Sequence, residues 1–336
     1  MRIGFPCDSN GKGGVRTWIK TFSNYCVNNG HEVFYSHDSQ VDVFITLANL
    51  SNKAQLEKLK SRGSKIVIRM DGIFFDYFTP SKKVAESLNN ALVENICCSD
   101  LVIFQSKFSK DLVDTILGNK KIKSTIIYNG IDKEIFSPNG DVVPREKNDK
   151  KIILSMAYWG TPEMADFSIR TIVDLARKLE NENYEFWILG EAYPETEEII
   201  KNANLPNITK WDIRNPISHN MVPKYLRTAD LVLHVRPNDA CSNFILEALN
   251  INKPIVGLNS GSTPELVGDC ALLANCYNDI KQLPVVDIDD FALKVIKTFD
   301  NYDFYKKKII ERSKYFTQEL MSEKYIEEIK RCLEVN

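Results

Sequence analysis

The stretch that most constrains the fold is residues 229–265, where two apolar runs flank a polar loop and a helical pattern. Residues 231–235 and 254–258 are apolar except for His234, which is typical of strands buried on both faces of a parallel sheet. Between them, residues 237–242 form a polar loop and residues 243–250 have helical periodicity. Strand, loop, helix and strand in this order make a βαβ unit, so the sequence predicts an α/β fold.

Two carboxylates lie in this stretch with seven residues between them, Asp239 in the loop and Glu247 inside the helix. The loop follows a strand at its carboxyl end, which is where open α/β sheets bind ligands. Ser242 is the expected N-cap, and the free N–H groups from Ser242 through Asn243 to Phe244 attract phosphate. Glu247 can accept both hydroxyls of a ribose, and Asp239 can accept hydroxyls of a sugar beyond the phosphates. The alternative for either acid alone is a solvated carboxylate without a ligand.

A Gly-rich loop over residues 8–14 follows the first expected strand and precedes an amphipathic helix. Gly13 and Gly14 have no Cβ, so their backbone can approach a diphosphate closely. Two common phosphate motifs do not fit this loop. Arg16 stands where a dinucleotide fingerprint needs glycine, and Gly13 stands where a Walker loop needs Ser or Thr.

Composition bounds the class of protein. The 336 residues suffice for two domains, and 43% hydrophobic with 26% charged residues indicates a globular, soluble chain. A net charge of −2 gives no overall basic field that would attract nucleic acid or anionic lipid. Eight cysteines without a CxxC pair predict free thiols in a reducing compartment, and four histidines show no metal spacing. We find no secretory leader and no apolar stretch of transmembrane length, and therefore expect a cytoplasmic protein without a metal or cofactor.

The block that begins at Asp239 resembles the retaining nucleotide-sugar glycosyltransferases of the GT-B fold, family 4, also described as glycosyl transferases group 1. Their pattern is two acids with seven residues between them, an Ala-Leu or Ala-Met pair, a Pro-Val strand and a Gly-rich turn ending in Pro-Glu. Here these parts are Asp239, Glu247 with the Ala-Leu that follows it, Pro254 and residues 261–265. The first acid is usually Glu. Residues 239–243 are similar to a branch of the family that has Asp-x-Cys-x-Asn at this place.

The resemblance extends to the first half of the chain. Gly13 and Gly14, and the Asn-Gly-x-Asp that begins at Asn129, are similar to family segments. Arg69 and Asp71 follow the strand expected at 65–70 and resemble the Arg-x-Asp-Gly of the same branch. We expect Asp71 to contact the acceptor or the donor sugar, with a structural Asp-Gly turn as the alternative.

The resemblance implies an architecture of two Rossmann-like domains that face a cleft. Residues 1–143 would form the acceptor domain, completed by a C-terminal helix at about 316–336 that crosses back to it. Residues 150–315 would form the nucleotide-sugar donor domain, and residues 138–151, rich in Pro, Asn and charge, would be the linker.

The implied function is transfer of a sugar, with retention of anomeric configuration, from a nucleoside diphosphate sugar such as a UDP- or GDP-sugar to an acceptor hydroxyl. The acceptor stays open: a glycan, a lipid or protein in a glycoconjugate, or a modified nucleobase. One alternative is a non-catalytic nucleotide-sugar-binding protein of the same fold, and another is a sugar-nucleotide epimerase. Peripheral membrane contact through the basic run 306–308 also stays open, beside the simpler interpretation of a solvated helix face.

One part of the family pattern is missing. Relatives place an Arg and a Lys after the strand expected at 151–156, and these cations neutralise the leaving diphosphate. Here the corresponding positions are Tyr158 or Trp159, and Met164 with the Ala that follows it. We expect Arg236 to replace them and to act in catalysis with Asp239 and Asp71. Arg69, Arg16 and Lys12 are further candidate cations, and for Arg69 and Lys12 we expect contact with the acceptor or sugar.

Overall fold

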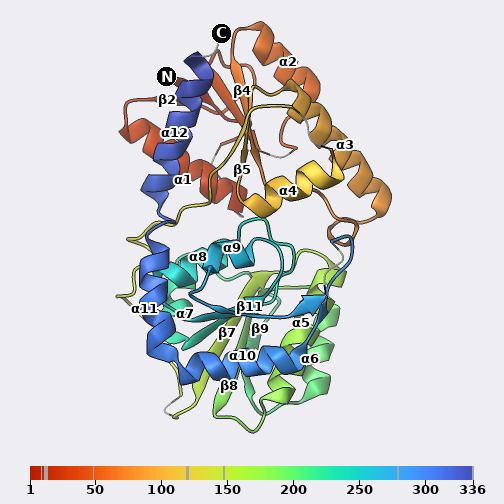
Figure 1. Ribbon diagram of the computed structural model, residues 1–336, viewed down its shortest axis with the longest axis vertical. Coiled ribbons are helices and arrows are strands. Elements are labelled where there is room, and N and C mark those ends of the chain that lie inside the picture. The colour runs from red at the N-terminus through yellow and green to blue at the C-terminus, as the bar shows by residue number, and fades with distance from the viewer. Residues whose placement is uncertain are drawn as a thin grey trace. The chain divides into compact units, whose positions relative to one another are not determined.

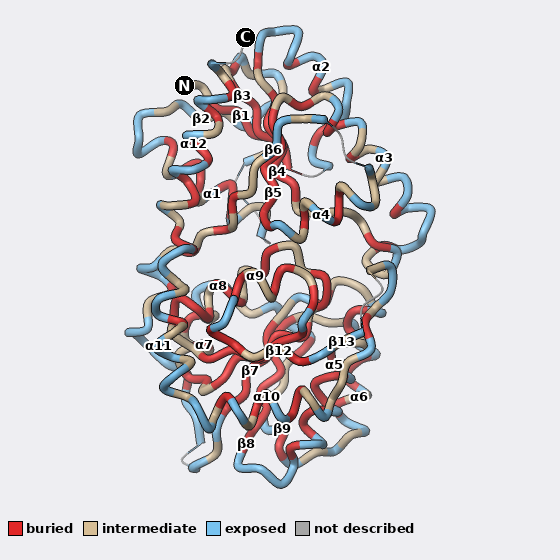
Figure 2. The backbone as a smooth tube through the Cα atoms, viewed as in Figure 1, coloured by how far each residue is buried: buried red, intermediate tan, exposed pale blue. Residues whose placement is uncertain are grey.

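The computed structural model describes residues 1–8, 10, 14–47, 49–118, 121–146, 148–277 and 280–334 (Figure 1). The chain forms two compact units. The first comprises Met1–Phe74, Lys83–Gly130 and Phe316–Asn336, and the second comprises Phe75–Lys82 and Ile131–Tyr315. Figure 2 shows that the central strands of each unit are buried, whereas much of the helix surface is exposed.

The first unit contains a parallel sheet of order β2-β1-β3-β4-β5-β6. Its strands are β1 Arg2–Gly4, β2 Glu32–Phe34, β3 Val43–Leu47, β4 Lys65–Met70, β5 Leu101–Phe104 and β6 Ser124–Ile126. Its helices are α1 Gly14–Asn28, α2 Lys53–Ser61, α3 Lys82–Cys98, α4 Lys107–Ile116 and α12 Gln318–Glu334. Helices α2 and α4 each begin with a capping box, at Asn52 and Ser106, which satisfies N–H groups that a helix start leaves free.

The last helix packs with the N-terminal half of the chain, as the sequence predicted. Tyr325 of α12 lies against α1, with ring centroids 5.1 Å from Trp18 and 5.2 Å from Phe22. Figure 1 shows α12, in blue, beside α1, in red. The chain returns to this unit next to Gly130, where a Cβ would lie 2.3 Å from the main-chain oxygen of Thr317, so only glycine fits.

The second unit contains another parallel sheet, of order β12-β11-β10-β7-β8-β9. Its strands are β7 Lys151–Tyr158, β8 Tyr184–Glu191, β9 Ile208–Asp212, β10 Leu231–His234, β11 Ile255–Leu258 and β12 Leu272–Ala274, with a hairpin of β13 Cys276–Tyr277 and β14 Val285–Val286. Its helices are α5 Pro162–Lys178, α6 Glu197–Ala203, α7 Val222–Thr228, α8 Asn243–Asn250, α9 Thr263–Val267, α10 Ile288–Asp300 and α11 Tyr302–Ser313, with 3-10 turns η1 Asp76–Phe78 and η2 Pro194–Thr196.

The two parallel sheets confirm the α/β prediction, and β4 and α8 have the predicted bounds. The sequence did not predict α6, α9 or the hairpin of β13 and β14. Residues 261–265 were expected to be a turn, but their second half begins α9. A helix of five residues has too little periodicity to be recognised.

Candidate functional site

Asp239 lies in the loop that joins β10 to α8, at the carboxyl edge of the second sheet. Its side chain is 20% exposed, with Oδ2 3.7 Å from Nε2 of His234 and 3.9 Å from Nε of Arg236. Burial by itself raises the pKa of Asp239, but the His234 ring, the Arg236 guanidinium and the Cys241 main-chain N–H more than offset it. The pKa of this carboxyl therefore lies below its usual range, and Asp239 is an anion at neutral pH.

The backbone around Asp239 is fixed by the loop after β11. Asn238 has a left-handed φ of 53°, its main-chain N–H donates to Ser260 Oγ at 3.1 Å, and Ser260 Oγ donates to its Oδ1 at 3.0 Å. The main-chain N–H of Ser262 donates to the main-chain oxygen of Asp239 at 2.8 Å. Gly261, with φ +63°, lies so close that a Cβ would be 2.6 Å from the Asp239 nitrogen. The two loops therefore hold one conformation, which presents the carboxylate of Asp239.

Glu247 lies on α8, in the wall of a pocket of about 210 Å³. Phe244 lines the same pocket, together with Tyr158 from the end of β7 and Glu191 from the end of β8. Burial raises the pKa of Glu247 to about 8, because an apolar environment disfavours the ionised form. Within the described residues, no hydrogen bond or ion pair to this carboxyl group is found. Such a group is suited to accept hydroxyl donors from a ligand.

The start of α8 lies between these two acids. Ser242 caps the helix, as predicted, by accepting from the main-chain N–H of Ile245 at 3.4 Å. Asn243 is the first residue of the helix and Phe244 the second. The N–H groups of this first turn are not used by the helix ladder, so they favour an anion.

Arg236 follows β10 and is partly exposed, with 37% of its side chain accessible. Its Nη1 donates to the main-chain oxygen of Tyr158 at 3.3 Å, and its Cζ lies 5.7 Å from the centre of the Phe78 ring. The guanidinium thus lies beside Asp239 and next to Tyr158, which lines the Glu247 pocket.

Of the four residues expected at the positions of the family's cations, three belong to the hydrophobic core. Trp159, Met164 and Ala165 are all buried in the core of the second unit. Tyr158, by contrast, is exposed. Arg236 is therefore the candidate cation that the described structure brings to Asp239.

Arg69 and Asp71 form a separate cluster in the first unit, where β4 ends. Arg69 is only 3% exposed and donates to Asp71 at 2.7 Å, to Gln105 at 2.8 Å and to Asn129 at 3.0 Å. Its Cζ also lies 4.9 Å from the centre of the Trp18 ring. Asp71 keeps 41% of its side chain accessible. Arg69 is engaged with the protein beneath the surface, whereas Asp71 is presented to solvent.

The structure places the remaining predicted residues as follows. Gly14 is the first residue of α1, while Gly13 and Lys12 lie outside the described residues. Arg16 pairs with Asp8, with 3.6 Å between Nη1 and Oδ1.

Four residues of the second unit's site were not predicted from the sequence. His234 was noticed in its strand but given no role, although it lies five residues before Asp239. Asn238 was part of the predicted loop. Its left-handed φ and its bonds to Ser260 show that it fixes the loop backbone beside Asp239. Tyr77 and Phe78 come from a distant part of the sequence. Their one signal was an aromatic-rich segment after Asp71.

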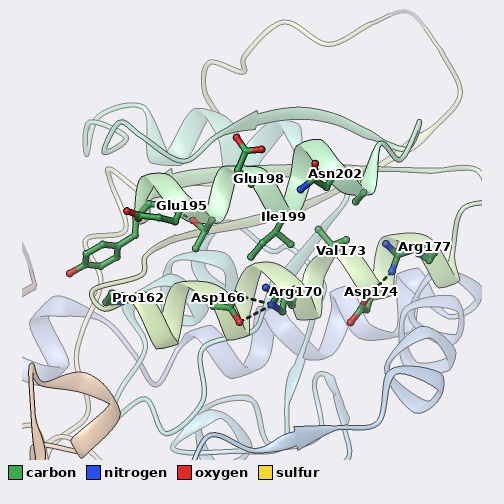
Figure 3. A pocket seen from close by; sticks show the side chains of 13 residues that line it. Pro162, Asp166, Arg170, Val173, Asp174, Arg177, Glu195, Glu198, Ile199 and Asn202 are labelled. Atoms are coloured by element: carbon green, nitrogen blue, oxygen red, sulfur yellow. Dashed lines mark hydrogen bonds and ion pairs between the residues drawn. The ribbon is translucent and has the colours of Figure 1, made fainter.

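A larger hollow of about 990 Å³ lies between α5 and α6 (Figure 3). On α5, Arg170 pairs with Asp166 at 2.8 Å and Arg177 with Asp174 at 2.8 Å. None of the described residues predicted for the site lines this hollow. Size alone therefore does not mark the site.

Two further searches cover only the part of the chain that the structure describes. No group of three or more His, Cys, Asp or Glu side chains there is arranged to hold a metal ion. No helix there is both long enough and apolar enough to cross a lipid bilayer. All eight cysteines are described and are free thiols, of which Cys97 is exposed.

The proteins that this chain resembles include glycosyltransferases. Residues 150–301 match the family model described as glycosyl transferases group 1. An uncharacterized glycosyltransferase of Methanocaldococcus jannaschii is 24% identical over 242 residues, which are 70% of this chain and 60% of that protein. The match thus spans less than two thirds of the relative.

Solved structures resemble the whole chain. Sucrose-phosphate synthase from Thermosynechococcus elongatus has a TM-score of 0.80 at 13% identity, and all of both chains is covered. HepE of Anabaena, solved in complex with UDP and glucose, has a TM-score of 0.69 at 14% identity, covering 98% of this chain and 99% of that one.

These likenesses define the class: the chain is a two-domain α/β protein with the GT-B fold. Within it, residues 150–301 resemble the glycosyl transferases group 1 family, and a glycosyltransferase is among the sequence relatives.

Proposed function

We propose that this protein is a retaining glycosyltransferase, which transfers a sugar from a nucleoside diphosphate sugar to an acceptor hydroxyl. The observation that carries the proposal is Glu247, a carboxyl group without a described partner, in a pocket beside the start of α8. Glu247 would accept the two ribose hydroxyls of a nucleoside bound in this pocket.

The diphosphate would lie at the start of α8. The main-chain N–H groups of Ser242, Asn243 and Phe244 supply partial positive charge there. As the bond from the anomeric carbon to the diphosphate oxygen breaks, negative charge develops on the leaving diphosphate. Arg236 would stabilise that charge, in place of the Arg and Lys that the family resemblance leads one to expect. Gly13 and Gly14 stay in the proposal as a second place of close backbone approach.

The transferred sugar would contact Asp239. This carboxylate has a pKa below its usual range, so it remains an anion that can accept sugar hydroxyls at neutral pH. The acceptor hydroxyl forms the new bond to the anomeric carbon as the bond to the diphosphate oxygen breaks, and its proton passes to the leaving diphosphate.

In the first unit, Asp71 would contact the acceptor or the sugar. Because Arg69 is buried and donates to Asp71, we revise its expected role from substrate contact to positioning of Asp71. Lys12 stays a proposed sugar contact from the resemblance alone.

The base and the sugar of the donor are a further part of the proposal. HepE, which has the same fold, was solved with UDP and with UDP-glucose, and a UDP-sugar is therefore the first donor to test. Retention rests on the family resemblance. The acceptor could be a glycan, a glycoconjugate or a modified nucleobase, and we propose a metal-independent reaction in the cytoplasm.

A second candidate is a non-catalytic protein that binds nucleotide sugars. It is favoured by one observation: Trp159 and Met164 are buried where relatives carry diphosphate-binding cations. An epimerase of related fold is distinguished by its product, which would be a changed nucleotide sugar.

The test is a panel of UDP- and GDP-sugars screened for thermal stabilisation, followed by NMR of the products formed from the best donor. We expect transfer or slow hydrolysis of the donor, with the anomeric configuration retained. Asp239→Asn should lose turnover and keep its fold, while Asp166→Asn, an exposed acid on α5, should behave as wild type. Donor binding without any turnover would favour the second candidate, and full turnover in Asp239→Asn would contradict the assigned role.

A further inference from the structure

A segment of the first half of the chain packs with the second unit. We call it the aromatic segment and define it as Phe75–Lys82, which follows Asp71 by four residues. Its three rings form one cluster: Phe75 stacks on Tyr77 at 5.0 Å, and Phe78 meets Tyr77 edge-on at 4.7 Å. The cluster gives a short loop a rigid, apolar core of its own.

The aromatic segment is attached to the loop after β10, which carries Asp239, and to the loop after β7. The Tyr77 hydroxyl accepts a hydrogen bond of 2.6 Å from Nδ2 of Asn238, in the loop after β10. The Tyr77 main-chain oxygen accepts one of 2.8 Å from Oγ1 of Thr161, in the loop after β7. Phe78 presents its ring to Arg236 with 5.7 Å between Cζ and the ring centre.

Each attachment reaches a residue whose geometry matters for the site. Asn238 is buried, has a left-handed φ and directly precedes Asp239. Its side chain is held from two sides, by Ser260 and by Tyr77. Without the Tyr77 hydroxyl, the Nδ2 group of Asn238 would lose a partly buried acceptor, which costs more than losing a fully exposed one. Arg236 stacks on Phe78 in the orientation that brings its Nε within 3.9 Å of Asp239.

From these contacts we infer that Tyr77 and Phe78 are positioning residues of the donor site: Tyr77 sets the backbone that presents Asp239, and Phe78 orients Arg236. The inference deepens the proposed function and rests on it for its kinetic readout. Binding of the nucleoside in the Glu247 pocket would not depend on the aromatic segment, because the described lining of that pocket contains neither Tyr77 nor Phe78.

The experiment is a double-mutant cycle on donor turnover in the full-length protein, with Tyr77→Phe, Asn238→Gly and the double variant. Glycine tolerates the left-handed φ of Asn238, so Asn238→Gly removes the side chain without backbone strain. Tyr77→Phe should lower kcat/KM for the donor about tenfold, because one partly buried hydrogen bond that positions Asp239 is lost. In the Asn238→Gly background, Tyr77→Phe should have no further effect, since its partner is already absent.

Phe78 has its own pair of variants. Phe78→Leu keeps apolar volume but removes the ring face under Arg236, and should lower kcat several-fold. Phe78→Tyr keeps the ring and should restore turnover. Tyr277→Phe, which changes a tyrosine that is 76% exposed, is the control for loss of a hydroxyl and should behave as wild type.

Additive effects of Tyr77→Phe and Asn238→Gly, or wild-type turnover in both Tyr77→Phe and Phe78→Leu, would overturn the inference. If wild-type protein neither binds nor turns over any donor, the proposed function fails, and amide hydrogen exchange then decides the inference by itself. Tyr77→Phe should speed exchange in residues 236–242 and leave the first unit unchanged. Unaltered exchange there would overturn it without reference to any ligand.

Discussion

At the scale of single residues, Glu247 makes stability depend on pH in an unusual direction. Its pKa in the folded protein is about 8, raised from 4.5 by burial. Between these values the folded protein holds a proton that the unfolded chain releases, so stability falls as pH rises. The contribution of Glu247 is fully present below about pH 4.5 and is lost as pH rises through about 8.

We therefore predict that Glu247→Gln, which cannot ionise, gains stability relative to wild type as pH rises across this range. Urea unfolding of both proteins near pH 4.5 and near pH 8 measures the difference. Glu198→Gln, at an exposed position on α6, is the control and should follow wild type at both pH values. A Glu247→Gln variant with the same pH dependence as wild type would show that this carboxyl group is ionised in the folded state.

At the scale of elements, the loops after β10 and β11 act as one structure because Gly261 lets them touch. Gly261→Ala should lower the free energy of unfolding by about 1–3 kcal/mol through its left-handed φ. It should also weaken donor binding, since the new Cβ would push against the backbone of Asp239. Gly63→Ala is the matched control: Gly63 has φ +90°, but its Cβ would meet nothing within 4 Å.

Denaturant unfolding and donor titration of both glycine variants separate two effects: the backbone strain of a residue with left-handed φ, and the displacement of Asp239. Gly63→Ala should lose stability and keep donor binding, whereas Gly261→Ala should lose both. Equal donor affinity in the two variants would contradict the idea that Gly261 positions Asp239.

The same elements show what the sequence could predict. Helix α8 was predicted with its bounds because its N-cap, its apolar face and the flanking strands are all local signals. Helix α9 was not, because it has five residues and its C-terminal carbonyls are bonded by Arg312, 46 residues after Leu266. Local patterns contain no information about a partner so far along the chain.

The candidate site likewise contains residues that local patterns predict and contacts that they do not. Asp239 and Glu247 could be predicted because strand, loop and helix order place them at the carboxyl edge of a sheet. The contact between Asn238 and Tyr77 could not, since 161 residues separate the two. The burial of Arg69 was missed as well, because it depends on Gln105 and Asn129, which follow β5 and β6 much later in the chain.

At the scale of the whole molecule, the two compact units have separate cores, which predicts separable unfolding transitions. Phe22→Ala should destabilise the first unit by about 3–5 kcal/mol, and Leu246→Ala the second by about 2–5 kcal/mol. A bound nucleotide sugar should raise the free energy of unfolding of the second unit, by about 2.7 kcal/mol when the free donor is at 100 times its Kd.

Calorimetric scans of wild type and both variants, with and without donor, measure these shifts. Phe22→Ala should lower the midpoint of the first unit's transition only, and Leu246→Ala that of the second unit's transition only. Added donor should raise the midpoint of the second unit's transition. A single cooperative transition that both variants shift equally would show that the two units do not unfold independently.

The central claim is that the second unit binds a nucleoside diphosphate sugar through Glu247. Titration calorimetry of wild type, Glu247→Ala and Glu198→Ala with the best donor of the panel tests it most directly. We expect one-to-one binding to wild type and to Glu198→Ala, and at least about tenfold weaker binding to Glu247→Ala, because the hydrogen bonds between this carboxyl group and the ribose hydroxyls are lost. Absence of binding of every donor to wild type, or equal affinity in Glu247→Ala, would contradict it.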